Sequence, residues 1–129
     1  MRKMILVFYF LLFFTRLFAA DKSYKILSTD IQTTINKDAT VDFIETREFS
    51  FKGEFSFVYQ VILKRGYNKI YDIQVFENDV AYLNTETKEP GTFLIDERKN
   101  SYRIYLYHRS ADEVKKFTIK YTLDNPFRI

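Results

Sequence analysis

The chain has 129 residues, with 20 Lys and Arg against 17 Asp and Glu, a single His and no Cys. This length fits one domain, and the lack of Cys excludes disulfides, a lipid-modified N-terminal Cys and Cys-containing zinc sites. Arg2, Lys3 and Arg16 are the only charged residues in positions 1–20, so residues 21–129 carry 17 basic and 17 acidic groups. A neutral domain lacks the basic surplus that nucleic-acid binding requires, and no nucleic-acid partner is expected.

The first 20 residues have the layout of a secretory signal peptide. Two basic residues precede an apolar run at positions 4–14, and Ala19 and Ala20 follow before Asp21. Arg16 ends the run short of the roughly 20 apolar residues of a membrane-spanning helix. Phe18 and Leu17 stand where a signal peptidase prefers small residues, so an uncleaved anchor stays open as the alternative. We predict a signal helix or anchor over residues 1–20, and an extracytoplasmic domain over 21–129 that meets the membrane only through an uncleaved N-terminal segment.

Alternation of apolar and polar residues predicts β-strands from residue 31 onward. Residues 31–35 alternate cleanly, and turn-forming residues at 36–39 end the first strand. A second strand covers residues 41–51, where Ile44 breaks the alternation and predicts a bulge near residues 44–45. Residues 55–63 are apolar on both faces, which predicts a central strand before a loop at 64–68.

The second half of the chain continues the pattern of short strands and polar turns. Strands are expected at 70–76, 80–83, 93–95, 101–107 and 117–123, with the longest loop at 84–91. Ile104 and Leu106 share one face of their strand. Seven or eight short strands without a helical pattern predict an all-β fold, a single antiparallel β-sandwich of the immunoglobulin-like kind.

Few residues in the domain suit catalysis. His108 stands at a strand end, where a solvated side chain is expected, and no Ser-His-Asp triad, metal site or cofactor is predicted. Asp42, Glu45 and Glu48 follow one strand and could serve a hydrolase. We favour ion pairs on the outer face of a sheet for these carboxylates, and we predict that the protein is not an enzyme.

The best candidate for a binding surface lies on the strand at 101–109. Arg103, Tyr105, Tyr107 and Arg109 occupy the face opposite Ile104 and Leu106. Tyr and Arg are enriched at interface hot spots, and tyrosine rings also stack on sugars. The alternative is structural, with cross-strand aromatic pairs covered by the aliphatic stems of the arginines.

Several short motifs occur in an order that resembles a known family. A turn at 35–38 precedes a strand at 41–46, and Phe51-Lys52-Gly53 precedes a tyrosine-led strand at 59–62. Strands at 70–75 and 117–121 follow. In this order, residues 24–121 resemble the extracytoplasmic N-terminal domain of the YciQ-like predicted membrane proteins, a bacterial family of unknown function. Gln60, Leu63 and Ala39 depart from its Arg, Pro and Gly.

The resemblance implies the outer part of a membrane protein, either stand-alone or truncated at its C-terminus. In the truncated case we expect an exposed sheet edge, and such edges invite strand pairing. The leading hypothesis is therefore a non-catalytic domain of the bacterial cell envelope that binds a protein partner or its own copy. The alternatives are a carbohydrate- or cell-wall-binding module and, third, a hydrolase.

Overall fold

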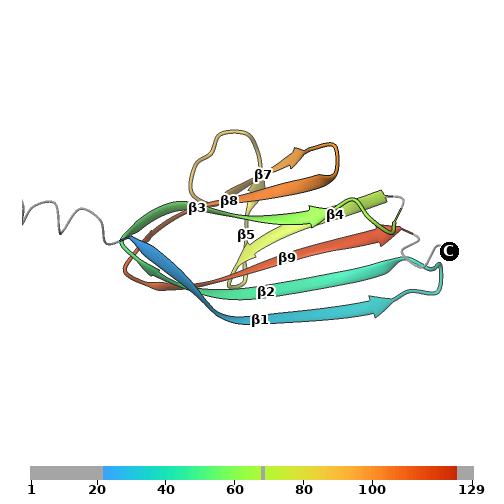
Figure 1. Cartoon of the computed structure of the whole chain (residues 1–129), viewed down its shortest axis with the longest axis horizontal. Coiled ribbons are helices and arrows are strands. Elements are labelled where there is room, and N and C mark those ends of the chain that lie inside the picture. The colour runs from blue at the N-terminus through green and yellow to red at the C-terminus, as the bar shows by residue number, and fades with distance from the viewer. Residues whose placement is uncertain (1–21, 68, 125–129) are drawn as a thin grey trace, which may run out of the picture.

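The computed structural model describes residues 22–67 and 69–124, so the expected signal helix lies outside the described residues. The domain is a β-sandwich of two sheets (Figure 1). One sheet has the order β1-β2-β9-β4-β5, and the other has the order β3-β8-β7-β6. The strands are β1 (Ser23–Ile35), β2 (Val41–Lys52), β3 (Glu54–Leu63), β4 (Lys69–Glu77), β5 (Val80–Ala81), β6 (Leu83–Asn84), β7 (Thr92–Glu97), β8 (Ser101–Ala111) and β9 (Val114–Asp124).

A bent two-stranded ribbon joins the two sheets. β2 pairs with β9 in the first sheet, and β3 pairs with β8 in the second, both antiparallel. Only Gly53 separates β2 from β3. Asp112 lies in the bend between β8 and β9, where its carboxylate accepts a hydrogen bond from the Gly53 N–H at 2.7 Å. Gly53 has φ +88°, a conformation that glycine adopts without strain. The ribbon therefore folds over at this corner, at the left of Figure 1.

The core lies between the sheets and is built from alternating residues of the ribbon and its neighbours. Ile104 and Leu106 are fully buried, as the alternation predicted. Phe117 and Ile119 of β9 and Val75 of β4 face them across the sandwich. No helix among residues 22–67 and 69–124 is long and apolar enough to span a membrane.

Three details differ from the predictions. The described part contains nine strands, two of them only two residues long, and β6 pairs with β7 in parallel. β3 is an edge strand, whereas its apolar residues predicted a central one. The prediction of a bulge near residues 44–45 was wrong, because β2 pairs with β9 in continuous register from Val41 to Ser50. Its alternation continues through Glu45 and Arg47, whose side chains face the interior.

Candidate functional site

The first strand has an apolar face that no other strand covers. All thirteen residues of β1 are exposed, although β1 pairs with β2 along its whole length. The register places six residues opposite inward-facing residues of β2, and these residues form what we call the β1 ledge: Tyr24, Ile26, Thr29, Ile31, Thr33 and Ile35. The remaining residues of β1 are polar except for Leu27, which lies at the register shift between Ile26 and Ser28. Half of the surface of Ile26 and Ile31, 52% in each case, is open to solvent.

The ledge is open because the second sheet ends one strand short. Gln60 of β3 hydrogen-bonds to side chains of β2, so β3 lies over β2 and not over β1. Contact between β1 and β3 is made near the corner, where the Tyr24 and Phe55 rings meet edge to face at 6.0 Å. β3 is paired only with β8, so its other edge is free. A cavity of about 570 Å³ lies between these strands and is walled mainly by apolar side chains.

Three of the polar side chains that line this cavity are hydrogen-bonded to one another. The Glu45 carboxylate accepts hydrogen bonds from Gln60 Nε2 at 2.8 Å and from Arg47 Nη2 at 3.3 Å. Arg47 Nη1 donates to Gln60 Oε1 at 2.6 Å, which closes the triangle. Burial and a hydrogen bond with Glu45 both raise the pKa of Tyr121. The carboxylate of Glu45, which is only 7% exposed, is thus well satisfied.

The charge of the cavity is positive on balance. Arg47 and Lys22 line it together with one carboxylate, that of Glu45. A guanidinium has five N–H donors, and the hydrogen bonds of Arg47 to described residues use only two of its nitrogens, Nη1 and Nη2. The Arg47 side chain is 23% exposed. A ligand with an acceptor group could therefore reach it from the open side.

The residues expected to form a binding surface lie together on the outer face of the second sheet. Tyr105 and Tyr107 of β8 stack at a centroid distance of 6.3 Å, and Arg103 lies over the Tyr59 ring at 5.3 Å. Phe57, which like Tyr59 lies on β3, contacts both Tyr105 and Tyr107. Arg109 alternates onto the same face and is exposed. The sequence analysis missed Phe57 and Tyr59, since only the register of β3 with β8 brings them here.

The three strand carboxylates do not form a common site. Glu45 points between the sheets, so its expected place on an outer face was wrong, whereas Asp42 and Glu48 lie on the outer face of the first sheet. Asp42 accepts a hydrogen bond from Thr122 Oγ1 at 2.6 Å. In the described part of the chain, no group of three or more His, Cys, Asp and Glu residues is arranged to hold a metal ion.

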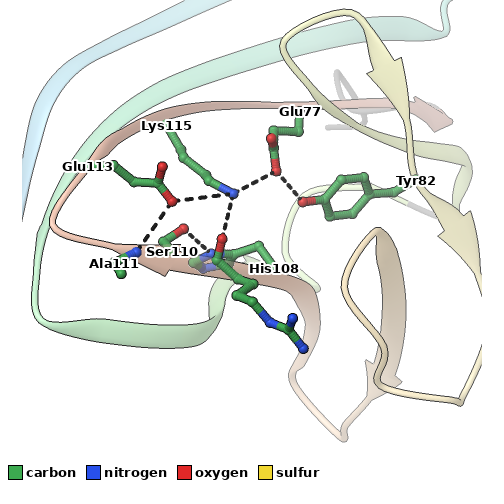
Figure 2. Close-up of polar contacts among 8 residues, drawn as sticks. Glu77, Tyr82, His108, Ser110, Ala111, Glu113 and Lys115 are labelled. Carbon is green, nitrogen blue, oxygen red and sulfur yellow. Dashed lines mark hydrogen bonds and ion pairs between the residues drawn. The ribbon is translucent and has the colours of Figure 1, made fainter.

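His108 is buried in the core, so the expectation of a solvated histidine was wrong. It is 2% exposed and lies between the rings of Phe51 and Phe117, with centroids 5.0 and 5.1 Å away. Its Nδ1 is 2.6 Å from the hydroxyl of Ser110, which is equally buried, and its Nε2 has no partner among the described residues (Figure 2). Burial and nearby Lys115 lower the pKa of His108 to about 4. The ring is therefore neutral at pH 7.

Lys115, whose side chain is largely buried, lies near this histidine. Lys115 Nζ donates to the Arg109 carbonyl at 2.8 Å and lies 3.4 Å from Glu77 Oε1 (Figure 2). The same Glu77 oxygen accepts a hydrogen bond from the Tyr82 hydroxyl at 2.7 Å. Glu113 Oε1 is 3.8 Å from the ammonium. These contacts tie the loop after β4 to the β8–β9 corner, a structural role.

The comparison with known families bears on the whole of this architecture. The family described as the N-terminal domain of predicted membrane proteins (DUF2207) matches residues 25–129. The chain belongs to this family. The resemblance seen in the order of the motifs is thereby confirmed. The DUF2207 match includes nearly all of β1, so the β1 ledge and the free edge of β3 are parts of the family domain. No curated protein and no solved structure matches the chain.

Proposed function

We propose that this domain is a non-catalytic, extracytoplasmic interaction domain that binds a protein partner at the β1 ledge. The carrying observation is the amphipathic strand β1, whose apolar face lies uncovered beside the free edge of β3. Exposed apolar patches mark interaction sites, and unprotected sheet edges pair with other chains. β3 carries none of the charged or proline residues that usually block edges, apart from Glu54 at its start.

Two features support a place outside the cytoplasm. Residues 1–20 have the basic, apolar and small-residue order of an export signal. The family is one of predicted membrane proteins, and the domain is N-terminal in them. An export signal followed directly by a β-sandwich fits a domain held at the outer side of a membrane or released from it.

Replacing Ile31 by Asp is expected to abolish partner binding while leaving the free energy of unfolding within about 0.5 kcal/mol. Ile31 is 52% exposed, so its loss removes little packing, whereas the new carboxylate would be desolvated beneath a bound partner. The measurement is photo-crosslinking in the host from a reactive residue at position 26, with and without the substitution.

Val80→Asp on β5 is the matched control, since Val80 is 68% exposed and lies at the other edge of the first sheet. It should leave the crosslinked species unchanged. No crosslinked species from position 26, or crosslinks at full yield in Ile31→Asp, would contradict binding through the apolar face of the ledge.

A carbohydrate partner is the second candidate, favoured by the aromatic outer face of β3 and β8. Tyr59 and Tyr105 are cross-strand neighbours with centroids 5.6 Å apart, and Tyr107 extends the row. Retention on peptidoglycan that falls at least about tenfold in Tyr105→Ala with Tyr107→Ala would support sugar stacking. Retention that survives these changes would leave the face a structural aromatic ladder. Phe76→Ala, on the first sheet, is the control.

A further inference from the structure

The open side of the sandwich has the width of one strand. Because β3 lies over β2, one more strand beside β3 would lie directly over the β1 ledge. Neighbouring strands in a sheet are about 4.8 Å apart, and facing sheets are about 10 Å apart. A single added strand would thus pair with the free edge of β3 through its backbone and cover the ledge with its inward side chains.

A second copy of the domain does not fit this place through pairing of its β3 with β3. In each copy β1 projects one strand beyond β3. Pairing β3 of one copy with β3 of another would leave no room between the two β2 strands for both projecting β1 strands. A slender occupant, an extended segment with no folded layer beneath it, meets no such obstacle.

The ledge also specifies the pattern of that segment. Along β1 the inward side chains run Ile26, Thr29, Ile31, Thr33 and Ile35, so the facing side chains of an occupant should be apolar at alternate positions. Arg47 lies beside Thr29 in the register and presents its remaining donors to the cavity. Lys22 adds a second positive charge, while both oxygens of Glu45 already accept hydrogen bonds.

We infer that the groove accepts one extended polypeptide segment as an added strand on β3, with alternating apolar side chains over the β1 ledge and a carboxylate that pairs with Arg47. This inference rests on the proposed function and names the chemistry of its partner. Backbone pairing with a sheet edge supplies affinity, and alternate side chains supply specificity, as in other cases of strand addition. A charge-assisted bond to a guanidinium adds discrimination.

A tethered guest strand tests this inference in the full chain. A linker of about 20 Gly and Ser residues after Ile129 spans about 25 Å and gives a high effective concentration. The guest has ten residues, valines alternating with threonines, and carries Glu, Gln or Lys at a central valine position. Alternation lets the guest shift by two residues until its central side chain meets Arg47. A guest of the same composition with consecutive valines is the control.

The Glu guest is expected to raise the melting temperature by about 5 °C more than the Gln guest, with the Lys guest lowest. Amides of β3 should gain protection from hydrogen exchange, whereas the edges at β5 and β6 should not. Equal melting temperatures for the Glu, Gln and Lys guests would overturn the carboxylate assignment, and the crosslinking result from position 26 would still decide the proposed function separately.

Two other outcomes would overturn strand addition itself. One is a set of guests that leaves the β3 amides unprotected, with the alternating and consecutive sequences behaving alike. The other is a dimer of the chain without guest, seen by light scattering, in which the amides of β1 and β3 are already protected. That result would assign the ledge to a second copy.

Discussion

The Arg47→Met variant is expected to lose about 2–3 kcal/mol of the free energy of unfolding. The substitution leaves Glu45, 7% exposed, without the cation 3.3 Å away, and it deprives Gln60 Oε1 of its donor. Removing one partner of a fully buried ion pair costs about 3–5 kcal/mol. The effect here is smaller because the Arg47 side chain is 23% exposed to the solvent of the groove. Urea unfolding at pH 7 measures the difference.

A double-mutant cycle separates the charge effect from lost packing. In Arg47→Met combined with Glu45→Gln, the uncompensated charge is gone, so most of the stability should return. Lys64→Met is the matched control, since Lys64 pairs with the exposed Glu97 at 2.8 Å and should cost less than about 1 kcal/mol. A loss under about 0.5 kcal/mol in Arg47→Met would mean that water in the groove solvates Glu45 adequately.

Acidification from pH 7 to pH 4 is expected to remove about 3 kcal/mol of stability through His108 alone. The pKa of this ring is lowered from 6.5 to about 4. Between these two pH values His108 is protonated in the unfolded chain but stays neutral in the folded core. The free energy of unfolding that depends on neutral His108 is fully present above pH 6.5. It decreases as the pH falls towards 4 and changes no further below pH 4. A tenfold difference in proton affinity between the folded and unfolded chain corresponds to about 1.4 kcal/mol.

The double variant His108→Phe with Ser110→Ala isolates the effect of His108 on the free energy of unfolding. It keeps an aromatic ring between Phe51 and Phe117 and removes both members of the buried hydrogen bond. Carboxylates titrate in both proteins, so the informative quantity is the difference between the two curves of unfolding free energy against pH. Parallel curves between pH 6.5 and 4 would show that the core opens to solvate the imidazolium.

The alternation in the sequence was sufficient to predict where the strands lie. It was not sufficient to predict which strands lie next to each other. Residues 31–35 and 117–123 form strands as expected, and the shared face of Ile104 and Leu106 is core. The same phase places His108 inward, so the sequence held a signal for its burial. Its position at the end of an apolar stretch obscured that signal.

The errors arise where long-range pairing decides the environment. Residues 55–63 are apolar on both faces, a pattern typical of burial on both sides, yet the outer face of β3 packs only sideways against the tyrosines of β8. Glu45 was assigned to the outside because charges are costly to bury. The amide of Gln60, from the other sheet, offsets that cost, and nothing local to β2 indicates it.

The binding surface chosen from the sequence lies on one face, but its role is still a prediction. Arg103 and Tyr105 were placed correctly because a strand has a period of two residues. The β1 ledge could not be recognised in this way. An amphipathic strand predicts that its apolar face has a cover, and only the order of strands in the second sheet shows that the cover is missing.

The bent ribbon also governs how fast this domain can fold. In this ribbon, residues 41–63 pair with residues 101–124. The chain must therefore close a long loop before the central strands of either sheet can pair. Closing a loop of this length costs conformational entropy before any stabilising contact forms. Folds dominated by such long-range pairings take milliseconds to seconds to form. During that interval β1 and β2 can form only an isolated hairpin with an apolar face. A newly synthesised chain is therefore most prone to aggregation before its corner has formed.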